Sequence, residues 1–159
     1  MILTFDFETY YDASYRLKRA NKTGLTTEEY INDERFEVIG VAVKEDDKPT
    51  VWHTGTAEEI KSELDCYDWE NNLCLAHNTR FDGAILKWKF GIEPQAYMDT
   101  MLIGQALIGS YSSVSLKKMA ESFDVGVKGD EVSRTSGKHR EDFTEEELER
   151  FAAYCKQDV

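Results

Sequence analysis

The first residues of the chain alternate apolar and polar side chains, which is the pattern of a β-strand with two different faces. Ile2–Phe7 follows this pattern, so we expect a strand there. Two further apolar and β-branched runs, Glu37–Lys44 and Thr50–His53, lie on either side of an Asp-Asp-Lys-Pro turn. Runs of this kind separated by a short turn predict a hairpin. Shorter strands are expected at Leu73–His77 and at Tyr97–Thr100.

Apolar residues at helical spacing predict helices between and after these strands. Capping boxes, in which Thr is followed three residues later by Glu, begin helices at Thr26, Thr56 and Thr144. The expected apolar faces are Ala57, Ile60 and Leu64; Phe81, Ala84, Ile85 and Trp88; Leu116, Met119, Ala120 and Phe123; and Leu148, Phe151, Ala152 and Cys155. The segment 101–107 is apolar all round, so that helix should be buried. Strands that come first and helices that interleave later predict a mixed α/β sheet.

Length and composition bound the class of protein. The 159 residues fit one globular domain, and no apolar run approaches the ~20 residues needed to cross a bilayer. The N-terminus lacks a basic stretch, so we expect no signal peptide. Three cysteines, none paired at metal-ligand spacing, indicate free thiols in a reducing cytosol, and the scattered histidines exclude a zinc site.

The net charge of −12 limits the modes of binding. It argues against broad, nonspecific binding to nucleic acid, which depends on Lys and Arg contacts to phosphate. It does not argue against an enzyme whose metal ions connect acidic side chains to a phosphate. Positive charge concentrates only at 16–22 and 128–140. These segments would either follow a nucleic-acid backbone or serve as ordinary solubilising surface.

The first candidate motif is Asp-x-Glu on the first strand. Asp6 and Glu8 project from the same face because residues two apart in a strand share a side, while Phe5 and Phe7 face the other way. Two carboxylates beside buried aromatic rings are costly unless they are paired or bind metal. A solvated sheet face would also carry such a triplet.

The second candidate motif lies where a strand ends and a helix begins, around Asn78. Asp82 falls in the first turn of that helix, where the helix dipole favours a negative charge. An ordinary N-terminal helix acid would explain it equally well. Asp82 is one residue off the Phe81–Trp88 stripe, so we expect it at the rim of the buried face, where a cleft could open.

The third candidate motif is Tyr154-x-x-x-Asp158 on the last helix. These two residues share a helix face and should flank the apolar stripe. An acid at the C-terminal end of a helix opposes the dipole, which hints at a nearby cation. A packed tyrosine ring and a frayed terminal acid are the alternative.

Together, and in this order, the three motifs resemble the DEDD superfamily of 3′-5′ exonucleases, in the subgroup with tyrosine in the third motif. The segment Met98-Asp-Thr-Met-Leu102 is similar to one in the exonuclease domains of family A DNA polymerases. The runs FDFET, EVIGVAVK, AHNTRFDGAIL and FTEEELERFAAYCKQDV look most like bacteriophage enzymes of that family.

The resemblance implies an α/β, ribonuclease H-like fold with a mixed five-stranded sheet flanked by helices. Residues 1–159 would be the exonuclease domain, cut from a longer DNA polymerase whose polymerase domain is its partner. The resemblance also implies a cytoplasmic location, which is the host cytoplasm if a phage encodes the protein, and it implies no membrane partner.

The resemblance also implies a catalytic set that binds two divalent ions, Mg²⁺ or Mn²⁺. Asp6, Glu8 and Asp158 would hold one ion, while Asp6 would bridge to a second that Asp82 holds directly or through water. Hard cations of this kind prefer carboxylate oxygens. Tyr154 would orient the attacking water, since a tyrosine with pKa ~10 is a poor base at neutral pH.

The resemblance implies a role for two more residues, Thr9 and Asn78, which match positions in the superfamily's motifs that contact the terminal nucleotide. The implied activity is proofreading: hydrolysis of single-stranded DNA from its 3′ end to nucleoside 5′-monophosphates. An exoribonuclease of the same superfamily is the alternative within enzymes. A catalytically silent module that binds nucleic acid is the alternative outside them, although all four carboxylates are present.

Overall fold

The computed structural model describes residues 1–18, 23–126 and 135–159, which fold around one mixed sheet. The strands are β1 (Ile2–Thr9), β2 (Val38–Glu45), β3 (Val51–His53), β4 (Leu73–Ala76) and β5 (Ala96–Asp99). The α-helices are α1 (Thr27–Asn32), α2 (Ala57–Leu64), α3 (Thr79–Phe90), α4 (Thr100–Ile108), α5 (Leu116–Phe123) and α6 (Glu145–Gln157), with short 3-10 turns at Trp69–Asn71 and Arg140–Asp142. Arg19, Lys22, Lys128 and Arg134, which belong to the two basic segments, lie outside the described residues.

The sheet has the order β3-β2-β1-β4-β5. β1 pairs antiparallel with β2 and parallel with β4, and β4 pairs parallel with β5. The expected hairpin is β2–β3, which pairs antiparallel around the Asp46–Pro49 turn. The prediction of a mixed five-stranded α/β sheet is therefore confirmed.

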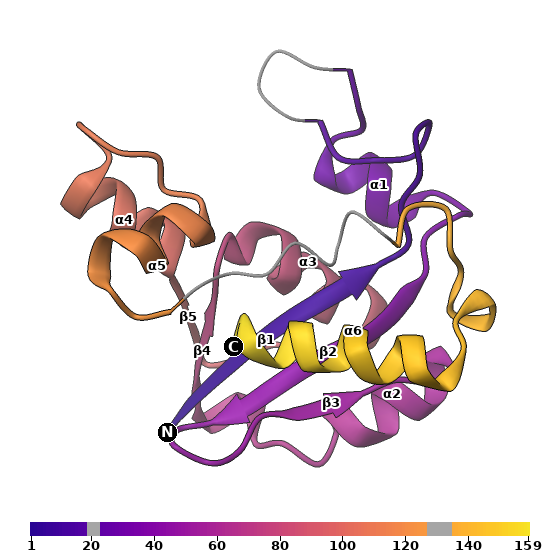
Figure 1. The fold of residues 1–159 in the computed structure, drawn as a ribbon. Helices are drawn as coiled ribbons and strands as arrows, with labels where there is room; N and C mark the ends of the chain where they lie inside the picture. The colour runs from indigo at the N-terminus through magenta and orange to yellow at the C-terminus, as the bar shows by residue number, and fades with distance from the viewer. Residues whose placement is uncertain (19–22, 127–134) are drawn as a thin grey trace.

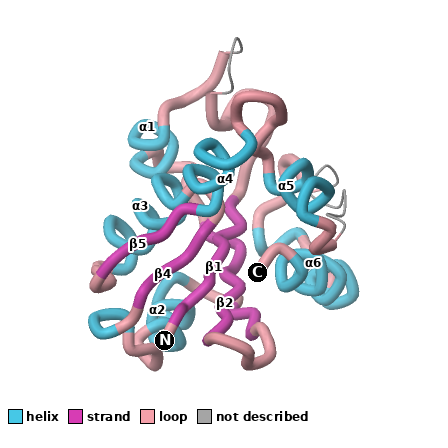
Figure 2. The backbone as a smooth tube through the Cα atoms, turned by 90° about the vertical axis from the view of Figure 1, so that its left-hand side faces the viewer, coloured by secondary structure: helices cyan, strands magenta, loops and turns pink. Residues whose placement is uncertain are grey.

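Helices cover both faces of the sheet, so the domain has three layers. α6 crosses the face seen in Figure 1, and α2 and α3 lie behind the strands. The side view of Figure 2 places α3 and α6 on opposite sides of the same strands. In the side view the C-terminus lies beside the sheet on the α6 side.

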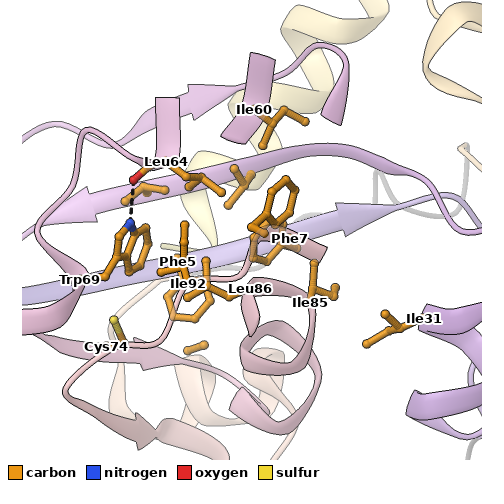
Figure 3. Close-up of a cluster of buried hydrophobic side chains, with 14 of the residues drawn as sticks. Phe5, Phe7, Ile31, Ile60, Leu64, Trp69, Cys74, Ile85, Leu86 and Ile92 are labelled. Atoms are coloured by element: carbon orange, nitrogen blue, oxygen red, sulfur yellow. Dashed lines mark hydrogen bonds between the residues drawn. The ribbon is translucent and has the colours of Figure 1, made fainter. Parts of the chain in front are cut away.

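The larger hydrophobic core lies between the sheet and the α2–α3 layer. Phe5 and Phe7 point into it from β1, with ring centroids 6.0 Å apart in an edge-to-face arrangement. Figure 3 shows both rings among the side chains of α2 and α3, and the Trp69 indole N–H donating to the Leu64 carbonyl. The alternation of β1 therefore sends its aromatic residues to this core and its acids to the opposite face.

The smaller core lies between the sheet and α6. It contains Ile39 and Ala42 from β2 with Phe151, Tyr154 and Cys155 from α6. Because Asp6 pairs directly opposite Ala42, the Asp6 side chain leaves the sheet on this side. The smaller core thus anchors α6 beside the acidic face of β1.

The three predicted capping boxes are all present. The side chains of Thr26, Thr56 and Thr144 each accept from the backbone N–H three residues on, and each glutamate returns a bond to its threonine. Gly91 ends α3 in the left-handed conformation.

One predicted buried face is wrong, and a second is wrong at one residue. Helix α4 was expected to be buried, but Leu102 and Leu107 are 52% and 60% exposed. In α3 the apolar stripe was expected to end at Trp88, which is half exposed, while Leu86 and Phe90 are buried. Both errors have the same cause: the face that a helix buries depends on the layer it packs against, which local periodicity does not specify.

Candidate metal centre

Three of the four predicted acids come together on one face of the sheet. Asp6 and Glu8 leave β1 on the α6 side, and Asp158 is the C-terminal cap of α6. Each offers one carboxylate oxygen, and these oxygens lie within 4.8 Å of one another. All three residues are partly buried. Segments about 150 residues apart in the chain therefore form one acidic cluster.

The donor set of this cluster fits a hard divalent cation. Magnesium binds oxygen at about 2.1 Å, so two ligand oxygens on opposite sides of the ion are about 4.2 Å apart. The three oxygens lie within 4.8 Å of one another, so small side-chain adjustments would let one ion contact all three. Without a cation, the same charges repel one another.

Asp82 lies deeper than the sequence predicted. It was expected at the rim of the buried face, but it is 3% exposed. Its Oδ1 accepts the backbone N–H of Phe7 at 3.0 Å, which ties the first turn of α3 to β1. Burial, followed by the nearby Asp6 carboxylate, raises the pKa of Asp82 well above its ordinary value. A buried acid beside other acids is the arrangement that a second cation would stabilise.

Tyr154 lies beside the acidic cluster but also belongs to the smaller core. The sequence placed it at the flank of the apolar stripe, whereas the structure buries it to 5% exposure. Burial, and then the charge of Asp158, raise the pKa of the Tyr154 hydroxyl, which also hydrogen-bonds Asp158. The hydroxyl is therefore protonated at neutral pH, so it can donate a hydrogen bond but does not act as a base.

Cys155 is a contact of the site that the sequence reading missed. Its side chain is fully buried, and its thiol hydrogen-bonds Glu8. Burial and the charge of Glu8 raise the pKa of this thiol, so it stays protonated as a donor. In the sequence, only the position of Cys155, next to Tyr154 and one turn before Asp158, indicated that it could lie at the site.

The two residues predicted to contact a nucleotide lie at the end of β1 and just after the end of β4. Thr9 ends β1, and its hydroxyl hydrogen-bonds the Tyr30 hydroxyl at 2.9 Å. Asn78 connects β4 to α3 in the left-handed conformation, with φ 69° and ψ 53°. Their contact with a nucleotide stays a prediction.

A cavity of about 170 Å³ opens beside the acidic cluster. It is lined by Thr4, Phe5, Asp6, Leu75, Ala76, His77, Thr100, Leu116, Asp158 and Val159. His77 contributes to its wall, and its Nδ1 lies 3.0 Å from the Thr100 hydroxyl. The acidic cluster is therefore accessible from a hollow walled by the ends of β4, α4 and α5.

Comparisons with known proteins agree with this architecture. The structure is similar to NrnC of Brucella melitensis with bound Mg²⁺, with a TM-score of 0.62 and 21% identity over 99% of this chain and 66% of that one. It is also similar to Trypanosoma brucei RNase D in complex with RNA U12 (TM-score 0.62, 14% identity, 98% and 52% of the two chains). Escherichia coli RNase D gives a TM-score of 0.61 at 18% identity over 99% and 36%. The fold is thus ribonuclease H-like, as the sequence predicted.

A family model described as 3′-5′ exonuclease matches residues 66–159. The chain therefore belongs to this family of metal-dependent 3′-5′ exonucleases. No curated protein matches the chain. The chain spans slightly less than two thirds of NrnC and between 36% and 52% of these two RNase D chains. No helix in the described parts is both long and apolar enough to cross a membrane.

Proposed function

We propose that the acidic cluster binds two divalent ions, Mg²⁺ or Mn²⁺, and that the protein hydrolyses single-stranded nucleic acid from its 3′ end to nucleoside 5′-monophosphates. The observation that carries the proposal is the meeting of Asp6, Glu8 and Asp158 within 4.8 Å, with buried Asp82 close to Asp6. The Mg²⁺ bound in NrnC supports the choice of cation. When bound, the ions would stabilise negative charge on the attacking and leaving oxygens of an in-line displacement.

The protein's own groups divide the remaining work. Asp6, Glu8 and Asp158 would hold the first ion, and Asp6 with Asp82 would hold the second. The Tyr154 hydroxyl, kept protonated by burial and by Asp158, donates its hydrogen to Asp158 and would accept a hydrogen bond from the attacking water, which orients that water.

Contact with the substrate would come from the end of β1 and the start of α3. Thr9 at the end of β1 and Asn78 at the start of α3 would contact the terminal nucleotide. The cavity beside Asp6 and Asp158 gives the scissile end access to the carboxylates.

RNA is the substrate that the similar structures favour. E. coli RNase D is described as an exoribonuclease involved in structured RNA processing, T. brucei RNase D is bound to RNA U12, and NrnC is bound to pGG. These likenesses support an exoribonuclease of the same superfamily.

Proofreading of DNA is the second candidate. It is supported by the segment Met98–Leu102 and by the other runs that resemble exonuclease domains of phage family A polymerases. In that case the chain would work as one domain of a longer polymerase on the 3′ end of single-stranded DNA.

The deciding experiment uses RNA and DNA single strands of the same sequence and length, each labelled at the 5′ or the 3′ end. With Mn²⁺ we expect 5′-labelled strands to shorten stepwise and 3′-labelled strands to release a labelled mononucleotide first, faster for RNA. Asp6→Asn serves as the inactive control. Faster hydrolysis of DNA would favour proofreading, and hydrolysis that persists in Asp6→Asn would refute the assigned site.

A further inference from the structure

Asp99 is a buried carboxylate whose hydrogen bonds connect two helices of the site. It ends β5 and is the N-cap of α4, where its Oδ1 accepts the backbone N–H groups of Met101 at 2.8 Å and Leu102 at 3.3 Å. The same carboxylate accepts from the start of α3, with Asn78 N at 3.1 Å and Thr79 N at 3.0 Å. Asp99 is 8% exposed, so one buried acid serves four backbone donors.

This double role follows from the sheet. β4 and β5 are parallel neighbours in which Ala76 pairs with Asp99, so the helices that follow them begin side by side. Side-chain bonds reinforce the junction: the Thr79 hydroxyl donates to the Met98 carbonyl at 2.9 Å, and His77 meets the Thr100 hydroxyl. The starts of α3 and α4 are therefore one hydrogen-bonded unit.

Helix α3 depends on Asp99 because the side chain of its own N-cap residue accepts no hydrogen bond from the first turn of the helix. Asn78 stands at the N-cap position but makes no side-chain capping bond. The first N–H groups of a helix need an acceptor from elsewhere. Asp99 supplies it from the neighbouring strand, and a carboxylate makes stronger bonds to N–H groups than a neutral acceptor does.

The start of α3 carries a residue of the proposed metal centre. Asp82 is the fourth residue of the helix, and it is held against β1 by the Phe7 N–H. Any shift at the first turn would therefore move Asp82 relative to Asp6. His77, one residue before the turn, stands in the wall of the cavity.

We propose that Asp99 is a positioning residue for the metal centre. Through the N–H groups of Asn78 and Thr79 it sets the start of α3, which places Asp82 against Asp6 and His77 in the cavity wall. The proposal rests on the proposed metal-dependent function, because it assigns Asp99 an effect on cation binding and not only on stability.

Three substitutions separate positioning from simple capping. Asp99→Ser keeps a good N-cap for α4, but its single short oxygen does not reach across to Asn78 and Thr79. Asp99→Asn keeps the oxygen shared by Asn78, Met101 and Leu102 and loses only the acceptor for Thr79. Thr56→Ala removes the cap of α2, away from the acidic cluster, and is the matched control.

The first measurement is Mn²⁺ binding followed by electron paramagnetic resonance of the free ion, which needs no substrate. We expect Asp99→Ser to weaken binding about 10–100-fold, the usual effect of losing a supporting contact at a metal site. Asp99→Asn should weaken it less, about 3–10-fold, and Thr56→Ala should leave it unchanged. Amide hydrogen exchange should show lost protection at Thr79 in both Asp99 variants.

These measurements distinguish failure of the Asp99 proposal from failure of the proposed nuclease function. If folded Asp99→Ser binds Mn²⁺ as Thr56→Ala does, the proposal is overturned; if Asp99→Ser does not fold, Asp99→Asn decides by the same comparison. A wild-type protein that binds Mn²⁺ but releases no mononucleotide would refute the nuclease function and leave the Asp99 comparison valid. Absence of Mn²⁺ binding in the wild type would overturn the inference together with the metal centre.

Discussion

Replacing Asp82 with asparagine should stabilise the metal-free protein while weakening its response to divalent cations. The substitution is nearly isosteric, and the asparagine Oδ1 can still accept the Phe7 N–H at 3.0 Å. What it removes is a buried ionisable carboxyl at 3% exposure, next to the Asp6 carboxylate, whose charged form burial disfavours. Most substitutions of buried polar residues destabilise a protein, so the opposite sign is a sharp expectation.

The expected gain in the free energy of unfolding is the difference between two opposing contributions. An uncompensated buried ion costs several kcal/mol even after relaxation. Exchanging a charged acceptor for a neutral one at Phe7 returns about 1 kcal/mol of that. We therefore expect the metal-free variant to be more stable than the wild type by about 1–3 kcal/mol at neutral pH.

The pH dependence has a definite sign. Because the folded pKa of Asp82 is raised, its contribution to stability is present below the unfolded value of about 3.9 and is lost as the pH rises through the folded value. The variant does not titrate at this position. The advantage of Asp82→Asn should therefore be largest at neutral pH and shrink as the pH falls toward about 4.

The assay is urea unfolding with chelator and thermal unfolding with and without Mn²⁺. At 100 times its dissociation constant a bound ion adds about 2.7 kcal/mol, and a chain of this size gains about 2–4 °C per kcal/mol. The wild-type Tm should thus rise by about 5–10 °C with Mn²⁺, and that of Asp82→Asn by at most half as much. Glu149→Gln, an exposed change of the same charge on α6, should match the wild type in both conditions. A metal-free Asp82→Asn that is less stable than the wild type, or an undiminished Mn²⁺ response, would refute the reasoning.

Three further predictions concern the last helix and a buried histidine. Tyr154→Phe should lower the rate of hydrolysis at least about 10-fold with Mn²⁺ affinity nearly unchanged, and equal losses of both would contradict a water-orienting role. Burial lowers the pKa of His53, against the weaker opposing effect of Glu63, so the contribution of His53 to stability is present above a pH of about 6.5 and is lost as the pH falls through the folded pKa. In His53→Gln, the free energy of unfolding in urea should therefore change less between pH 5 and pH 7 than in the wild type. An unchanged pH dependence would show that His53 does not cause it. Thr144→Ala, which breaks the capping box of α6, should lower the free energy of unfolding by about 1 kcal/mol in urea titrations, whereas no loss would mean that the helix end is held by other contacts.

The parts of the fold that the sequence predicted well are those specified locally. Alternation along β1 assigned its two faces, and threonine–glutamate capping boxes located three helix starts. These signals act within a few residues and do not depend on the rest of the chain. The predicted face of α4 and the Trp88 end of the α3 stripe were wrong because each helix has more than one apolar stripe. In α4, Gly104 allows close packing against Met119 of α5, which leaves Leu102 and Leu107 exposed.

The candidate site was predictable only in pieces. Strand geometry placed Asp6 and Glu8 together, but nothing local linked them to Asp158, and that link came from the resemblance to a family. The depth of Asp82 and the contact of Cys155 with Glu8 depend on how α3 and α6 cross the sheet. Asp99 was noted only as part of the segment Met98–Leu102, and its bonds to the start of α3 depend on two neighbouring parallel strands.

The most direct test of the metal centre is anomalous diffraction from crystals grown with Mn²⁺. The geometry predicts a manganese peak within about 2.5 Å of carboxylate oxygens from Asp6, Glu8 and Asp158. A second peak should lie between Asp6 and Asp82. Manganese bound elsewhere, or a folded protein with no peak at these carboxylates, would contradict the assignment.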